Sequence, residues 1–211
     1  MTSTHVTGGG RRRTRHTRAR ILEAARQELG RDPDSSLTDI AEAAGVVRRT
    51  VYDHFAGRPA LIEGLAADAA EALRRALAGV AAPDPDAVTA MARFVLALWP
   101  VGDRYRMLLR LAPQGLGAER ANEILSPARD MATAIIERGQ QQGVFRTGVP
   151  PAPLSRALER LLLALLECVN TGTLNDDGTR TATAALIAVG ADGRLAVARV
   201  QGLGRMEPVG A

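Results

Sequence analysis

Residues 36–55 read SLTDIAEAAGVVRRTVYDHF, and this stretch decides the predicted fold. Ser36 and Asp39 have the spacing of a capping box, which starts a helix. The apolar residues that follow recur at helical spacing and would form a buried stripe: Leu37, Ile40, Ala41 and Ala44. Gly45 then supplies the left-handed backbone that a sharp turn requires. A second short helix is expected over about residues 48–54, with apolar contacts from Val46, Val51 and Phe55.

Two short helices joined by a glycine turn form a helix-turn-helix, whose second helix lies in the DNA major groove. The second helix here begins with two arginines, which make bidentate contacts to guanine or charge-assisted contacts to phosphate. Hydroxyl and imidazole groups suit phosphate oxygens, and so do helix N-termini. The predicted DNA-binding residues are Ser36, Arg48, Arg49, Thr50, Tyr52, His54 and Arg58. Two alternatives stay open: Tyr52 could pack in the core, and His54 could be an ordinary surface or hydrogen-bonded histidine.

The charge distribution points to the same end of the chain. All 27 basic residues are arginine, and the formal net charge of the 211-residue chain is +4. Residues 1–58 contain 11 arginines and 7 acidic residues, whereas residues 59–211 contain 16 of each. The excess positive charge therefore lies in the first quarter of the chain, which suggests a polyanionic partner there.

Cysteine content and hydropathy bear on the compartment. Cys168 is the only cysteine, so no intrachain disulfide is possible and a reducing compartment fits. An amphipathic segment, and not the apolar stretch of a secretory signal, follows the arginine-rich start. The longest strongly apolar run, Leu161–Leu166, is far shorter than the roughly 20 residues of a membrane span. We expect a soluble, cytoplasmic protein.

No arrangement typical of an enzyme stands out. The sequence contains no evident nucleophile–base pair, glycine-rich phosphate loop or metal cluster. Its histidines, His5, His16 and His54, do not have metal-ligand spacing with Cys168. We therefore expect neither catalysis nor a metal or cofactor.

The rest of the chain predicts further helices and no strand, so the fold class is all-α. Residues 1–16 are interpreted as a flexible basic arm that could be a solvated tail or could touch DNA. Residues 17–58 would form the helix-turn-helix domain, with a first helix from about Thr17 to Leu29. Residues 59–205 would form a second, helical domain. Its helices are expected over about 59–79, 86–98 (closed by Trp99-Pro100), 103–112, 117–142 (interrupted or kinked at Ser126-Pro127), 154–169 and 180–190, with a short helix after Gly193.

The pattern IA-x-x-A-G-V-x-x-x-T-V-Y-x-H-F, from Ile40 to Phe55, resembles the signature of the TetR family of bacterial transcriptional repressors. Ile21-Leu22-x-Ala24-Ala25 is similar to that family's first helix, and the resemblance covers about residues 17–65. It implies a three-helix DNA-binding head, a connecting fourth helix, and a C-terminal domain that dimerises and binds a small molecule. It also implies that the seven residues named above contact DNA. Two positions depart from the family pattern: Val47 replaces a serine cap, which loosens the helix start by about 1 kcal/mol, and Arg58 replaces lysine.

The second domain offers a dimer surface and a less specific ligand site. Helix 154–169 is apolar nearly all round, which a lone surface helix could not tolerate, and helix 180–190 carries closely spaced alanines. We expect the two helices to pair with those of a second subunit in a four-helix bundle, the alternative being ordinary intrachain core. The candidate ligand-binding residues, for which core packing is the alternative, are Phe94, Leu98, Trp99, Tyr105, Leu108, Met131, Ile135 and Leu162. An anionic ligand or pairing with nearby acids would each explain Arg104, Arg106 and Arg110.

Together these features predict a dimeric, sequence-specific repressor that a small molecule releases from a palindromic operator. The alternative is a DNA-binding regulator without a small-molecule effector, controlled by its abundance or by a protein partner.

Overall fold

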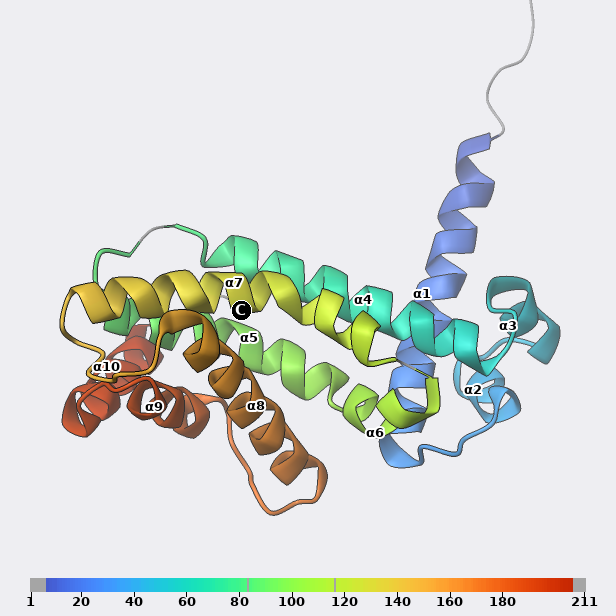
Figure 1. Cartoon of the computed structure of the whole chain (residues 1–211). Helices are drawn as coiled ribbons and strands as arrows, with labels where there is room; N and C mark the ends of the chain where they lie inside the picture. Colours follow the sequence, from blue (N-terminus) through green and yellow to red (C-terminus); the bar gives the residue numbers. More distant parts are fainter. Residues whose placement is uncertain (1–6, 83, 116, 207–211) are drawn as a thin grey trace, which may run out of the picture. The chain divides into compact units, whose positions relative to one another are not determined.

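A computed structural model describes residues 7–82, 84–115 and 117–206, which form ten helices and no strand (Figure 1). The chain divides into two compact units. The first comprises Met1–Asp68 and Met107–Gly117, and the second comprises Ala69–Arg106 and Ala118–Ala211. The division falls inside a helix that connects the two units. No sequence signal indicated that the segment from Met107 joins the first unit.

Five helices contribute to the first unit: α1 (Thr7–Arg31), α2 (Leu37–Ala43), α3 (Arg48–His54), the start of α4 (Arg58–Gly79) and α6 (Met107–Gly115). Helix α2 packs against both α1 and α3, and α6 packs against α1. The buried apolar side chains of this unit include Ile21, Leu22, Leu29, Ile40, Val51, Phe55, Leu61 and Leu65. These residues fall at the spacing that the sequence predicted for one face of each helix.

Helix α1 corrects the predicted start of the first helix and the extent of the flexible arm. The helix begins at Thr7, ten residues before Thr17, and it ends at Arg31. Residues 1–6 of the predicted arm, His5 among them, lie outside the described residues. The arginines of this segment have a high helix propensity, and extending an existing helix adds one backbone hydrogen bond for each residue fixed, whereas the glycines at positions 8–10 disfavour its first turn. Figure 1 shows the N-terminal half of α1 continuing past the ends of α2 and α3.

The predicted capping and turn of α2 are confirmed. The Ser36 hydroxyl accepts hydrogen bonds from the amides of Thr38 and Asp39, each at 3.2 Å. Gly45 has φ +61°, and the amide of Val46 donates to the Ala41 carbonyl at 3.0 Å. This pattern is a Schellman motif, which ends α2 and starts the turn into α3.

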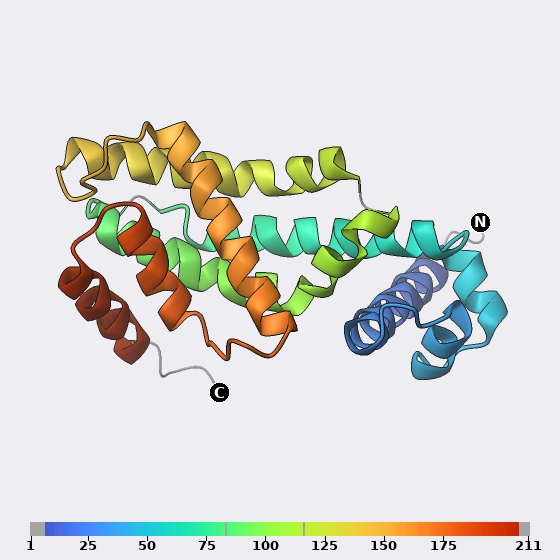
Figure 2. The same cartoon turned by 60° about the horizontal axis from the view of Figure 1, so that its bottom comes forward.

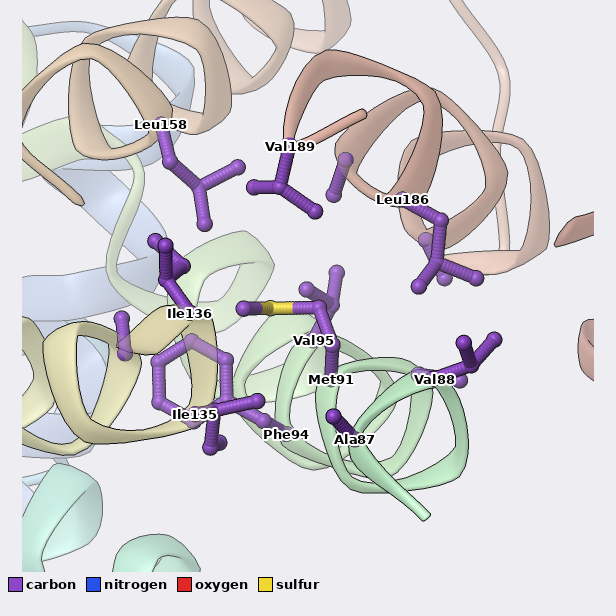
Figure 3. Packing of buried hydrophobic residues seen from close by; sticks show 14 of the residues in the cluster. Ala87, Val88, Met91, Phe94, Val95, Ile135, Ile136, Leu158, Leu186 and Val189 are labelled. Atoms are coloured by element: carbon purple, nitrogen blue, oxygen red, sulfur yellow. The ribbon is translucent and has the colours of Figure 1, made fainter. Parts of the chain in front are cut away.

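The second unit packs four helices around α5 (Ala87–Tyr105). They are α7 (Ala118–Gln141), α8 (Pro151–Asn170), α9 (Thr179–Ala188) and α10 (Gly193–Met206). Figure 2 shows α9 and α10 covering one side of α5, in agreement with the packing of both helices on it. In Figure 3, side chains from α5, α7, α8 and the end of α9 point to a common centre: Met91, Ile136, Leu158 and Val189.

Three boundaries in the second unit differ from the sequence prediction. Helix α5 continues through Pro100 to Tyr105, although proline removes one backbone hydrogen bond, because the flanking residues are packed into the fold. Helix α7 likewise runs through Pro127 without interruption. Helix α10 extends over 14 residues and buries Ala196 and Val200 against the core, so it is more than the short helix expected.

Candidate nucleic-acid interface

Helix α3 is fixed by its buried side. Val51 is fully buried and Phe55 is 3% exposed. The guanidinium carbon of Arg18, on α1, lies 5.0 Å from the centre of the Phe55 ring. A Cβ atom at Gly64 would lie 2.7 Å from Phe55, so only glycine at this position of α4 leaves room for the ring. The opposite side of α3 is thereby turned to solvent.

Arg48 and Tyr52 form a pair on this exposed side, one helical turn apart. The guanidinium carbon of Arg48 lies 5.4 Å from the centre of the Tyr52 ring, and Nη2 donates a hydrogen bond to the tyrosine hydroxyl at 3.2 Å. Tyr52 is 45% exposed and lies outside the apolar core. Stacking holds the guanidinium in one orientation, so little side-chain entropy remains to be lost when it meets a ligand.

The other three predicted contacts on α3 differ in exposure. Arg49 is exposed and makes no hydrogen bond or ion pair with any residue that the structure describes. Thr50 and His54 are half-buried, and the His54 ring centre lies 6.4 Å from that of Phe55. The structure therefore brings Arg48, Arg49 and Tyr52 to the surface of one short helix, with Thr50 and His54 at its margin.

Ser36 and Arg58 are engaged in holding the fold. The Ser36 hydroxyl caps α2, and both its hydroxyl and its amide donate to the Asp39 carboxylate at 2.8 Å. These two hydrogen bonds, that of the amide first, lower the pKa of Asp39. Arg58 donates to the Ser35 carbonyl at 2.6 Å and to the Pro33 carbonyl. Both residues thus shape the loop before α2; the sequence predicted this cap for Ser36 but predicted Arg58 only as a DNA contact.

Two arginines that sequence reasoning did not assign to the head stabilise its helix ends. Arg20 donates to the carbonyls of Ala44 and Gly45, at 2.6 and 3.5 Å. Arg110 donates to the carbonyls of Gly30 and Leu29, at 2.5 and 3.3 Å. Each contact satisfies carbonyls at the C-terminal end of a helix. The partners are 24 to 81 residues apart in the chain, so no local pattern could reveal them.

The predicted ligand-binding residues mostly serve the interior of the second unit. Phe94 and Ile135 belong to the buried cluster, and Leu98, Met131 and Leu162 pack against it. Leu108 belongs to the first unit, whereas the other seven residues belong to the second. The indole N–H of Trp99 donates to the Asp176 carbonyl at 3.1 Å, which ties α5 to the loop before α9.

The polar residues next to these candidates also have contacts within the protein. Tyr105 is buried beneath the Arg104 guanidinium, whose carbon lies 5.8 Å from the ring centre. Arg106 pairs with Asp103 at 2.7 Å. The described residues hold no group of three or more His, Cys, Asp or Glu side chains placed to bind one metal ion. Among them, no helix combines the length and apolar character needed to cross a bilayer.

Comparison with known proteins agrees with this geometry. Residues 21–65 match the family model described as bacterial regulatory proteins, tetR family. The same end of the chain is similar to the HTH-type transcriptional repressor LfrR of Mycolicibacterium smegmatis, with 44% identity over 66 residues. That match covers 31% of this chain and spans 33% of the length of the curated relative.

Solved structures are similar over most of the chain. One is the TetR-like regulator LfrR from Mycobacterium smegmatis in complex with proflavine. It has a TM-score of 0.64 at 24% identity, and the match covers 82% of this chain and 94% of the LfrR chain. A second similar structure is NalD, the secondary repressor of the MexAB-OprM multidrug efflux pump in Pseudomonas aeruginosa. It has a TM-score of 0.57 at 25% identity, and the match covers 83% of this chain and 96% of the NalD chain. The head of this chain is thus similar to that of the tetR family of bacterial regulatory proteins, and its fold over most of the chain is the fold of these solved regulators.

Proposed function

We propose that the chain is a sequence-specific DNA-binding repressor that acts as a homodimer. The observation that carries the proposal is the exposed side of α3, where two adjacent arginines face solvent without an acidic partner among the described residues. The second helix of a helix-turn-helix enters the major groove with its first residues at the base edges. Arg48 and Arg49 are the first two residues of α3, and arginine recognises guanine through two parallel hydrogen bonds.

The proposed contacts fall into two groups. Arg48 and Arg49 would read bases, while Thr50, Tyr52 and His54 would bind phosphate oxygens through hydroxyl and imidazole groups. Ser36 and Arg58 already form hydrogen bonds within the head. They would bind phosphate only through donor groups that these internal hydrogen bonds do not use. The exposed arginines of the N-terminal half of α1 include Arg12, Arg13 and Arg15, and they extend the basic surface of the head. A duplex that touches both helices would meet the part of the chain in which the excess positive charge lies.

Helices α8 and α9 support the dimer. Four consecutive or nearly consecutive leucines of α8 remain only half-buried within one chain: Leu161, Leu162, Leu163 and Leu165. On α9, Ile187 is 51% exposed. Pairing these helices with the same helices of a second copy would remove this apolar surface from water and form a four-helix bundle. Two heads in one dimer would read two half-sites about one helical turn apart.

We further propose release by a small molecule, in the cytoplasm where the operator lies. The similar LfrR structure contains proflavine. Helix α4 continues from the first unit into the second, so a ligand that selects one conformation of the second unit could change the separation of the two heads. A regulator without an effector is the second candidate. The use of Phe94, Ile135 and Trp99 in the fold favours it, because these residues are already in contact with protein.

Selection from a random duplex pool tests the proposal. The purified full chain is expected to enrich a palindromic sequence, and light scattering is expected to give the mass of a dimer. Failure to enrich any sequence would contradict the proposed function. A thermal-shift screen of metabolites then separates the two candidates, because an effector raises the melting temperature of the protein and lowers its affinity for the selected duplex.

A further inference from the structure

Val47 is the most exposed large apolar side chain among the described residues. It is 70% exposed and stands directly before α3 with extended backbone, as the residue that caps this helix. Its side chain makes no capping hydrogen bond. Val46, which precedes it, is half-buried, and Val51 is fully buried, so burial does not require valine at position 47.

The fold offers no reason for this residue. Serine, threonine, aspartate or asparagine at a cap position would satisfy an orphan amide, which valine leaves without a side-chain acceptor. A single exposed apolar residue is ordinary by itself. An apolar residue that both forgoes a cap and stays exposed breaks two local rules at once, and such conflicts are expected at functional positions.

The neighbours of Val47 indicate what it meets. It is followed by Arg48, whose guanidinium is stacked on Tyr52, and by Arg49, which has no partner among the described residues. A cationic surface of this kind fits a polyanion and not an apolar protein surface. Within the major groove the only apolar group on a base edge is the 5-methyl group of thymine.

We propose that Val47 selects a thymine in each operator half-site, through contact between its methyl groups and the thymine 5-methyl group. This inference rests on the proposed function. It assigns recognition of an A·T pair to a position that makes no hydrogen bond with its side chain. Arg48 and Arg49 would then read guanine or phosphate beside it.

Replacing thymine by deoxyuridine tests the inference, because uracil lacks only the 5-methyl group. The full chain is first used to select a duplex from a random pool, and each thymine of that duplex is then replaced in turn. Replacement at one position of each half-site is expected to weaken binding about fourfold for each thymine, the value for one buried methyl group. No duplex enriched would overturn the proposed function itself. An enriched duplex without any sensitive thymine would overturn the role of Val47 alone.

Three variants separate recognition from helix stability. For Val47→Ser the ratio of affinities for the thymine and deoxyuridine duplexes is expected to fall to about one, whereas Val47→Thr keeps one methyl group and part of the effect. Val197→Ser makes the same change at an exposed valine of α10 and is expected to keep the full ratio. If Val47→Ser changed both affinities in parallel and kept the ratio, the side chain would act only through α3 and the inference would be wrong.

Discussion

Two arginines of the second unit pair with acidic side chains of other elements, whereas no exposed arginine of α3 or of the described N-terminal half of α1 has an acidic partner among the described residues. Arg129 on α7 meets Glu159 on α8 at 2.8 Å, and Arg199 on α10 meets Asp86, the cap of α5, at 2.9 Å. Arg49 has no such partner among the described residues. One residue type therefore joins elements of the fold at positions 129 and 199 and presents charge without an acidic partner on α3.

This difference separates stability from recognition. An arginine whose charge is matched within the fold contributes to holding two elements together, and it has little left for an external anion. An exposed arginine without a counter-charge contributes little to folding, and it binds a polyanion at no internal cost. Substitutions in the two units should therefore change different measurements.

Glu159→Ala is expected to have the largest effect, on stability alone. Arg129 and Glu159 are 10% and 16% exposed, so removing the carboxylate leaves a nearly buried guanidinium without its counter-charge. The free energy of unfolding should fall by about 3–5 kcal/mol, measured by urea denaturation. Glu123→Ala is the matched control, because its pair with Arg120 is exposed, and it should cost less than about 0.5 kcal/mol. Equal losses in the two variants would show that the α7–α8 pair is not a cross-link.

Arg49→Ala is expected to show the opposite behaviour. Its melting temperature should match that of the unmodified chain, because no described residue depends on the side chain. Binding to the selected duplex should weaken by about 1–3 kcal/mol if Arg49 reads a base. Arg194→Ala removes an exposed arginine of the second unit and should leave the affinity unchanged. An unaltered binding curve for Arg49→Ala would remove this residue from the interface.

Ser36→Ala tests whether the capping of α2 supports the head. Loss of the hydroxyl removes the acceptor for two amides and should lower the stability of the head by about 1 kcal/mol, measured by thermal unfolding. A smaller change in the affinity for DNA would follow, because α3 is positioned through α2. If affinity fell steeply while stability stayed constant, Ser36 would act as a direct contact instead.

Low pH should remove part of the stability that the hydrogen bonds between Ser36 and Asp39 give to the head. The pKa of Asp39 in the folded chain lies below the ordinary value of an aspartate, because the Ser36 amide and hydroxyl donate to the carboxylate. The contribution of Asp39 to stability is therefore complete above that value and is lost as pH falls through the folded pKa. The difference in melting temperature between the unmodified chain and Asp39→Asn should shrink in this acidic range. A constant difference down to low pH would contradict the assignment.

The sequence predicted the helix-turn-helix closely because its signals are local. Ser36 and Asp39 are three residues apart, and α2 ends where the amide of Gly45 donates to the Glu42 carbonyl and that of Val46 to the Ala41 carbonyl. Helix α3 spans the predicted residues 48–54 for the same reason. The DNA-contact residues drawn from this segment remain predictions.

Long-range packing explains what the sequence could not predict. Pro100 normally ends a helix, but Trp99 is held by the Asp176 carbonyl 77 residues away, and α5 continues. Residue type predicted Arg58 as a DNA contact and left Arg110 open between an anionic ligand and nearby acids, whereas the structure uses both to hold backbone carbonyls of the head. Residue type limits the chemistry of a side chain, and only tertiary structure decides between an internal and an external partner.

Arg12→Ala is expected to have the smallest effect, and it tests how far the uncompensated charge extends along α1. Arg12 is exposed and has no partner among the described residues, so its loss should leave stability unchanged. If its guanidinium neutralises one phosphate, the slope of log affinity against log salt concentration should become shallower by about 0.9. Sequence preference should stay the same, because a phosphate contact carries no base information. A slope identical to that of the unmodified chain would confine the DNA-binding surface to α3 and its margins, and the N-terminal half of α1 would then be a solvated basic helix.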